Sequence, residues 1–151
     1  MFHAAVVTFF VSMIPVLELR GAIPMGVARG LPPLAAMAIA IVGNLAPVPF
    51  LILFTRRIFQ YLKTRNRVRS LVERLEARAA DKSELVERYA EIGLCILVAI
   101  PLPGTGAWTG ALVATMMNMR LRRAMPAISV GVVIAGLIIT TLTYGVKHLL
   151  R

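Results

Sequence analysis

Long stretches without charge constrain this chain more than any other feature of its sequence. Four stand out, at residues 1–17, 31–54, 92–119 and 124–146. A helix needs about 20 apolar residues to cross the hydrocarbon core of a membrane, and residues 31–54 and 124–146 each reach that length. With 58% apolar and 16% charged residues among 151, the chain has too little polar surface for a soluble domain of this size. We therefore expect a single all-α membrane domain over residues 1–151, with one transmembrane helix in each of these two stretches.

The other two charge-free stretches are interrupted. Residues 1–17 are short for a span, and Pro15, Glu18 and Arg20 come before apolar character resumes through residue 28. Residues 92–119 are long for one span and carry Pro101-Leu-Pro-Gly-Thr-Gly106 in their middle. Two prolines remove backbone donors and two glycines loosen the chain, so a helix breaks there. We expect a helical hairpin over residues 1–28 and a second one over residues 92–119.

The positions of Lys and Arg predict on which side these hairpins enter. Most basic residues lie in the segment 55–91, and the loop 120–123 contains three arginines. Basic loops favour the cytoplasmic side of a membrane, and a full crossing by residues 92–119 would separate these two. A re-entrant hairpin keeps both in the cytoplasm and leaves both termini outside. We expect a multi-pass protein of the inner (plasma) membrane.

The resulting order of elements is that of an inverted-topology repeat. Residues 1–54 hold a re-entrant hairpin (1–28) and a transmembrane helix (31–54), and residues 92–151 hold the same pair (92–119 and 124–146) in the opposite orientation. Short sequence matches support the repeat: Ile14-Pro15 corresponds to Ile100-Pro101, and Gly21-Ala22 to Gly106-Ala107.

The linker 55–91 has apolar residues at spacings of three and four, which predicts an amphipathic cytoplasmic helix. Its mixed charges favour a solvated connector that packs on its own protein. The alternative is a helix on the membrane surface that binds anionic lipid through Arg65, Arg67 and Arg69. The net charge of +10 lies between apolar blocks, where it faces lipid headgroups, so we expect no nucleic-acid partner.

Glu18 is the only acidic residue outside the linker and its edge. An ionisable group at the tip of a membrane hairpin is a functional candidate, although Glu18 and Arg20 could also pair with each other or lie in water. Helix breaks leave backbone N–H groups that attract anions and carbonyls that attract cations. We expect Glu18 to be a proton or cation site, and Arg20 with the second tip to be an anion site.

Further candidate binding residues come from the second tip and its surroundings. Asn44 is the strongly polar residue of the first full span, and it either lines the cavity or bonds between helices. Trp108 either lines the site or anchors at the interface. The complete set of expected substrate- or ion-binding residues is Glu18, Arg20, Asn44, Pro101, Pro103, Gly104, Thr105, Gly106 and Trp108.

Catalytic and metal-ligating patterns are missing from the sequence. No nucleophile lies beside a candidate base, no glycine-rich phosphate loop precedes a lysine, and His3 and His148 have no acidic or cysteine neighbours at metal-ligand spacing. We expect no catalytic residues, no metal and no cofactor, and we do not expect an enzyme.

Three motifs carry a resemblance to a known family. Glu18-Leu-Arg-Gly-Ala-Ile-Pro24, Gly43-Asn44 with its prolines, and Pro101-Leu-Pro-Gly-Thr-Gly-Ala-Trp-Thr-Gly110 together resemble the small multidrug export protein family over nearly the whole chain. That family is similar to the DedA (VTT-domain) membrane proteins, which resemble lipid scramblases and carriers of lipid-linked phosphate and share paired re-entrant hairpins. DedA-type proteins have an acidic residue beside the Pro-Gly of their second tip, where this chain has Thr105. The resemblance implies a transporter with Glu18, Arg20 and the tip 101–106 at its site.

We therefore expect a secondary transporter or lipid translocator. It would move a small organic ion or an anionic lipid headgroup between the two tips, coupled to protons or cations. Its partners would be membrane lipids, the small-molecule or lipid substrate, and a second copy, because a chain this short encloses a path more easily as a homodimer. The alternative is a non-transporting scaffold or lipid-binding protein that acts through the basic linker.

Overall fold

The computed structural model describes residues 1–63, 83–102 and 105–149, and all regular structure in these ranges is helical. This confirms the predicted all-α class. In chain order the helices are α1 (Phe2–Ser12), α2 (Glu18–Ala28), α3 (Pro33–Leu45), α4 (Val48–Lys63), α6 (Ser83–Ala99), α7 (Ala107–Met116) and α8 (Leu121–Leu149).

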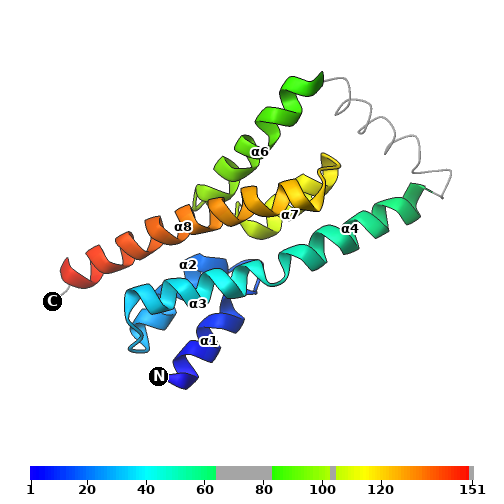
Figure 1. The fold of residues 1–151 in the computed structure, drawn as a ribbon. Coiled ribbons are helices and arrows are strands. Elements are labelled where there is room, and N and C mark those ends of the chain that lie inside the picture. The colour runs from blue at the N-terminus through cyan, green and yellow to red at the C-terminus, as the bar shows by residue number, and fades with distance from the viewer. Residues whose placement is uncertain (64–82, 103–104, 150–151) are drawn as a thin grey trace.

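Two helical segments, Pro33–Ile58 and Leu121–Gly145, are long and apolar enough to cross a membrane, as expected for residues 31–54 and 124–146. The first is not one uninterrupted helix, because α3 ends at Leu45 and α4 begins at Val48. Pro47 and Pro49 have no backbone N–H to donate to the carbonyls one turn earlier, so the helical hydrogen bonds are interrupted between α3 and α4. The span is bent at this point, as Figure 1 shows.

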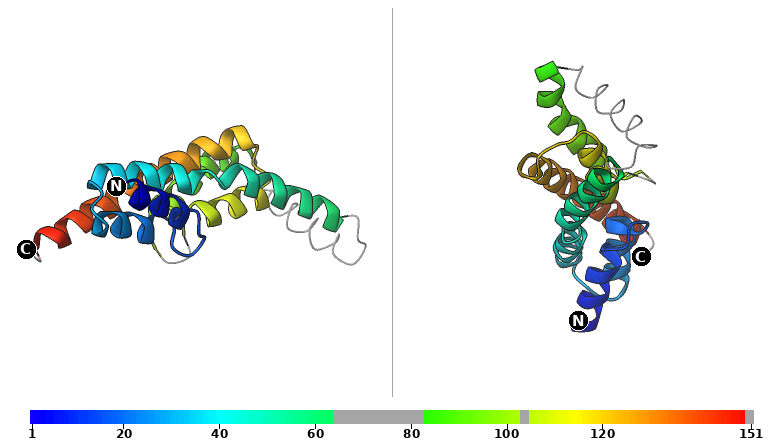
Figure 2. Two further views of the ribbon diagram at one scale, coloured as in Figure 1. Left: turned by 90° about the horizontal axis from the view of Figure 1, so that it is seen from below. Right: turned by 90° about the vertical axis from the view of Figure 1, so that its right-hand side faces the viewer.

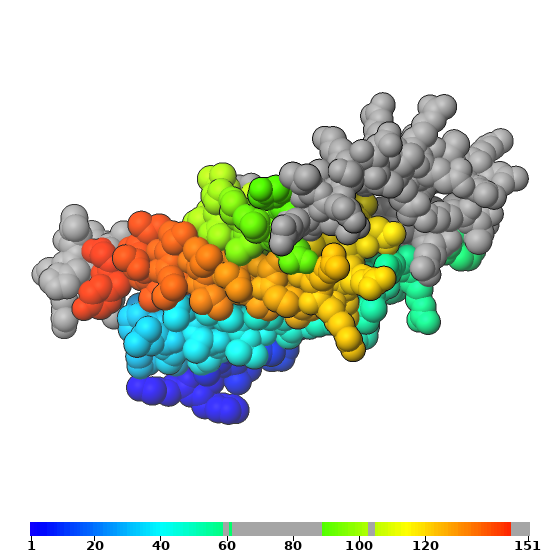
Figure 3. Space-filling view, turned by 45° about the horizontal axis from the view of Figure 1, so that its top comes forward, coloured from blue at the N-terminus to red at the C-terminus, as the bar shows by residue number. Residues whose placement is uncertain are grey.

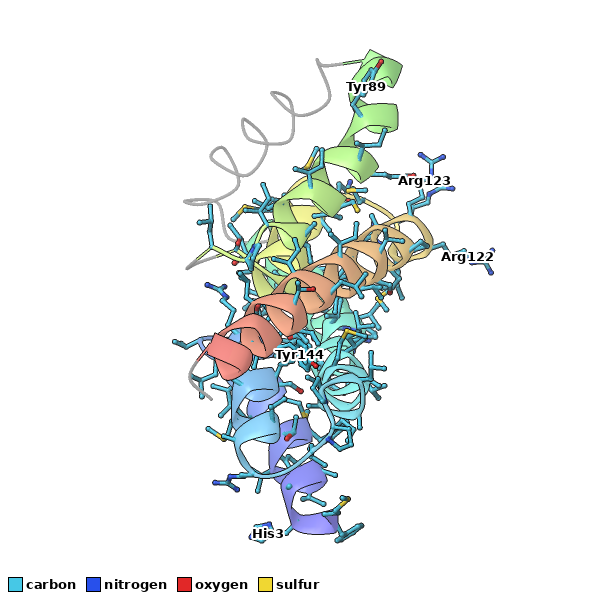
Figure 4. All side chains as sticks on the ribbon, turned by 90° about the vertical axis from the view of Figure 1, so that its left-hand side faces the viewer. His3, Tyr89, Arg122, Arg123 and Tyr144 are labelled. Atoms are coloured by element: carbon cyan, nitrogen blue, oxygen red, sulfur yellow. The ribbon has the colours of Figure 1, made fainter. Side chains whose placement is uncertain are left out.

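The second span begins earlier than its sequence suggested. Arg122 and Arg123, expected in a loop at 120–123, belong to the first turn of α8, and Figure 4 shows both side chains pointing outward there. The N–H groups of Arg123 and Ala124 donate to the carbonyl of Arg120 at 2.9 and 3.0 Å, which closes this turn. Pro126 lies inside α8 and has no N–H to donate to the carbonyl one turn earlier, yet the helix continues past it to Leu149.

The predicted linker 55–91 is not a separate element in the part that the structure describes. Residues 55–63 continue α4 and residues 83–91 belong to α6, while Arg65, Arg67 and Arg69 lie outside the described residues. The helix α6 thus begins at Ser83, before the residue 92 at which the charge-free stretch starts.

Both expected interruptions are present as breaks between helices. We name residues 13–17, between α1 and α2, the first break, and residues 100–106, between α6 and α7, the second break. Residues 103 and 104 of the second break lie outside the described residues. In each case the helix ends near the proline that the sequence offers there, Pro15 or Pro101.

The helices pack as two groups of three. The helices α1, α2 and α3 contact one another, and so do α6, α7 and α8. The two groups meet where α8 lies against α2 and α3, and α4, which follows α3 and belongs to neither group, lies against α7. Figure 3 shows α8 between α3 and α6 along one face. Figures 1 and 2 show both termini at one end of the molecule and the last turn of α4 at the other.

Alanine makes up about half of the buried apolar residues, alongside fully buried residues such as Ile23, Ile52 and Ile128, and many large apolar residues point outward. The helix contacts bury mainly alanine, with Ala22, Ala36, Ala40, Ala107, Ala114 and Ala124 fully enclosed. By contrast, the side chains of Val16 and Phe50 are 81% and 80% exposed. Close packing through small residues, with bulky apolar side chains facing the surroundings, is typical of helices in lipid.

Candidate functional site

A small cavity lies where the two groups of helices meet. Its walls come from the start of α2, from the second break, and from α3, α6, α7 and α8. The lining residues are Glu18, Leu19, Arg20, Asn44, Val98, Pro101, Thr105, Gly106, Ala107, Val132, Ala135 and Ile139. We name it the central cavity. It has room for about one water molecule, so in this conformation it is too small for an organic substrate.

Glu18 lies at the boundary of the first break and α2, and its side chain turns toward the other half of the chain. The residue is 5% exposed, and its backbone is left-handed with φ of 45°. The backbone N–H of Trp108 donates to Glu18 Oε1 at 3.3 Å. Trp108 is in the first turn of α7, where N–H groups have no partner within the helix. The carboxylate of Glu18 therefore caps α7 and lies at the positive end of its dipole.

Gly106 makes this contact possible. It precedes α7 with φ of 145°, a conformation that L side chains rarely adopt, and any Cβ at this position would collide with the Glu18 carboxylate. Glycine is thus required here both for the backbone turn and for the approach of the carboxylate.

Arg20 binds the same break through a different group. Its Nη2 donates to the carbonyl oxygen of Thr105 at 2.6 Å. No ion pair joins Glu18 and Arg20 among the residues that the structure describes, and each charge has a backbone partner instead, in α7 for Glu18 and in the second break for Arg20. The interpretation in which Glu18 and Arg20 merely pair with each other is wrong for this conformation.

The second break is held in shape by the Thr105 hydroxyl. Thr105 Oγ1 lies 2.6 Å from the carbonyl oxygen of Ile100 and 2.9 Å from that of Leu102, and it accepts from the N–H of Leu102 at 3.1 Å. A third contact between the two halves of the chain joins α7 to the first break, where the indole Nε1 of Trp108 donates to the carbonyl of Met13 at 3.2 Å.

Asn44 reaches the central cavity from α3. It is 1% exposed, and its Oδ1 has no hydrogen-bond partner. The preceding residue, Gly43, contacts α1 so closely that a Cβ would collide with the Ser12 hydroxyl and the Phe9 carbonyl. This close approach of α1 and α3 fixes the position of Asn44 beside the cavity.

The structure thus brings together most of the expected site residues. Glu18, Arg20, Asn44, Pro101, Thr105 and Gly106 line the central cavity, whereas Trp108 contacts Glu18 from its edge. The expected residues Pro103 and Gly104 lie outside the described residues. Sequence reasoning missed the wall formed by α8, although Val132, Ala135 and Ile139 recur at spacings of three and four and so share one helix face.

Comparison with known proteins agrees with the membrane character of this arrangement. The family model for small multi-drug export proteins matches residues 18–138. The chain belongs to this family. The match begins at Glu18 and includes the first span, the second break and most of the second span, and the family description indicates membrane transport rather than catalysis. Neither a curated protein nor a solved structure matches the chain.

Proposed function

We propose that this small multi-drug export protein is a secondary transporter whose substrate binds at the central cavity. The observation that carries the proposal is the placement of Glu18 and Arg20 on backbone groups of the second break and the first turn of α7. An ionised residue in a membrane interior is costly, and such residues mark ion or substrate pathways. The left-handed backbone of Glu18 adds a second cost of the kind that accumulates at functional sites.

The substrate in this proposal is a small organic ion or an anionic lipid headgroup. The first turn of α7 supplies N–H groups and Arg20 supplies a positive charge, and together they suit a carboxylate or phosphate. Glu18 would exchange a proton during transport, because its carboxylate occupies the place where such an anion would bind. Opening of the two breaks would enlarge the cavity.

In the topology that we propose, both helix pairs are re-entrant. The pairs α1–α2 and α6–α7 would each dip into the membrane, and the two groups of helices would form an inverted repeat. Support comes from their matching order of helix, break, helix and long apolar segment. The arginines near the start of α8 and the end of α4 would face the cytoplasm, with both termini outside.

Transport by reconstituted protein tests the proposal. Vesicles of phosphatidylcholine and phosphatidylglycerol would receive two probes, ethidium as an organic ion and fluorescent phosphatidylglycerol as an anionic lipid. With the probe that the wild type moves, we expect Glu18→Gln and Arg20→Ala to lower the rate at least about tenfold, because each removes a charged group from the cavity. Arg122→Ala is the control, since this arginine is exposed and points away from the cavity.

Wild-type rates in both cavity variants would contradict the proposal. That result would favour the scaffold alternative, in which charge reversal at Arg65, Arg67 and Arg69 abolishes function. We also propose a homodimer, since so small a chain encloses a path more easily with a partner. A monomeric mass in mild detergent would contradict the dimer.

A further inference from the structure

The central cavity contains an acceptor without a donor. Asn44 lines the cavity, and its Oδ1 is buried and has no hydrogen-bond partner. Buried polar atoms in folded proteins nearly always have a partner, so an exception calls for an explanation. A helix–helix hydrogen bond, the structural role that the sequence allows, is not made by Oδ1 in this conformation.

Glu18 has two protonation states that need different partners. As a carboxylate it accepts hydrogen bonds, and the N–H groups at the start of α7 satisfy it. As a neutral acid it has an O–H to donate, and it no longer benefits from the positive end of the α7 dipole. A protonated Glu18 therefore needs a nearby acceptor, and Asn44, whose Oδ1 is an unpartnered acceptor, lines the same water-sized cavity.

We propose that Asn44 is the acceptor for protonated Glu18, so that this carboxyl group has two alternative positions. When Glu18 takes up a proton from water, its O–H donates to Asn44 Oδ1 and its oxygens leave the start of α7. The freed N–H groups and Arg20 can then hold the anionic group of a substrate. Loss of the proton returns the carboxylate to α7, where it competes with the anion. Proton and anion would thus move together.

Other charged groups around Glu18 do not offer another cause for the movement of its carboxyl group between α7 and Asn44. Arg20, on α2, is the one other ionisable side chain that lines the cavity among the described residues, and it is held by the Thr105 carbonyl. The linings from the remaining elements are uncharged: Asn44 from α3, Val98 from α6, Ala107 from α7, and Val132, Ala135 and Ile139 from α8. Asn44 is therefore a positioning residue in this proposal, which rests on the proposed transport function.

The chain carries its own reporter for this movement. Trp108 is the single tryptophan, and its backbone N–H is the donor to Glu18. We expect its fluorescence in vesicles of phosphatidylcholine and phosphatidylglycerol to change in one step between about pH 4 and about pH 9 as Glu18 leaves α7. Glu18→Gln should abolish that step. Asn44→Leu should move its midpoint to lower pH by about one unit, a tenfold weaker proton affinity, because the neutral acid loses a hydrogen bond.

A matched control is available in Thr140, whose Oγ1 is also buried without a partner but does not line the cavity. Thr140→Val should leave the midpoint unchanged. If the Leu variant does not fold, Asn44→Ala serves in its place with the same expected direction. A midpoint that stays in place or rises would overturn the assignment, because an apolar residue that acts only by excluding water would favour the neutral acid and raise it.

The transport assay distinguishes a failure of the Asn44 proposal from a failure of the transport proposal. If Glu18→Gln abolishes both transport and the fluorescence step while Asn44→Leu alters neither, the role of Asn44 is wrong and the transport proposal stands. If Glu18→Gln retains transport and the step, both are wrong. A wild type that transports without any fluorescence step overturns the two-position proposal alone.

Discussion

The two breaks contribute to the central cavity in opposite ways. Next to the first break, α2 supplies charged side chains, Glu18 and Arg20. The second break and the start of α7 supply backbone groups, the carbonyl of Thr105 and the N–H of Trp108. Charges from one half of the chain are therefore held by peptide dipoles of the other. Ionised groups can be kept in an apolar interior when backbone dipoles hold them in place of water.

The glycines near the two breaks, Gly21 and Gly106, also differ in what surrounds them. A Cβ on Gly106 would collide with a carboxylate that is itself held in place, whereas a Cβ on Gly21 would lie 3.0 Å from the Leu17 side chain. The second break is thus shaped to receive a side chain, whereas Gly21 lies inside α2 and faces the Leu17 side chain one turn earlier. Four experiments test this difference between the two breaks.

The largest expected effect is an all-or-none labelling pattern. If both helix pairs re-enter the membrane, Ile58→Cys and Arg122→Cys should react with an impermeant maleimide from the cytoplasmic side only, and His3→Cys from the outside only. The background is Cys95→Ala, which removes the native thiol. Labelling of positions 58 and 122 from opposite sides would show that α6 and α7 together cross the membrane, and the two breaks would no longer be comparable.

The next effect is that of Gly106→Ala. A methyl group there collides with Glu18 and strains a left-handed backbone, so we expect a loss of about 2 kcal/mol or more in unfolding free energy and at least a tenfold loss of transport. Gly21→Ala should cost less than about 1 kcal/mol, because the Leu17 side chain can shift. The measurements are unfolding in detergent and flux in vesicles.

A double variant shows whether the collision with Glu18 is the cause. In a Glu18→Ala background the methyl group of Gly106→Ala meets no carboxylate, so the added loss should fall to the backbone strain alone. Additive losses would mean that Gly106 acts through its backbone and that its closeness to Glu18 is incidental.

A smaller effect is expected from Thr105→Val. The change removes the hydroxyl that bonds to the backbone of Ile100 and Leu102 within the second break. It should cost about 1 to 2 kcal/mol of stability and weaken the hydrogen bond to Arg20. Thr105→Ser keeps the hydroxyl and should restore both stability and flux. If Ser and Val behave alike, the hydroxyl does not shape this break.

The smallest effect should follow Trp108→Phe. It removes one neutral hydrogen bond, from the indole to the Met13 carbonyl, and keeps the backbone N–H that holds Glu18. We expect a loss of about 1 kcal/mol in unfolding free energy and transport within about threefold of wild type. A loss of transport as deep as that of Glu18→Gln would show that the indole, rather than the backbone, is the group that matters.

Local features of the sequence predicted much of this protein. Spans follow from charge-free length, and the breaks follow from Pro15 and Pro101, because a missing backbone donor interrupts a helix wherever the chain lies. Glu18 and Arg20 could be singled out because charge is rare in apolar sequence. The bend between α3 and α4 was missed although Pro47 and Pro49 are visible, since prolines in membrane helices can either kink or break them.

The contacts of the site could not be predicted in this way. Trp108 lies 90 residues from the carboxylate that it holds, and Thr105 lies 85 residues from Arg20. Their bonding groups are a backbone N–H and a backbone carbonyl, which every residue but proline possesses, so no residue type marks them. The α8 wall was missed for a related reason: a stripe such as Val132, Ala135 and Ile139 has the composition of any buried helix face.

The sequence by itself determined an all-helical membrane chain with two spans, two breaks and one acidic residue outside its charged linker, because these depend on hydrophobicity, proline and charge along the chain. Only the tertiary structure decided that Glu18 caps α7, that Arg20 binds a carbonyl instead of Glu18, and that Asn44 faces their cavity with an unpartnered oxygen. These contacts require two helix ends that are distant in the sequence to lie next to each other in space. The packing of α2, α3, α7 and α8 determines where those ends and their peptide dipoles lie.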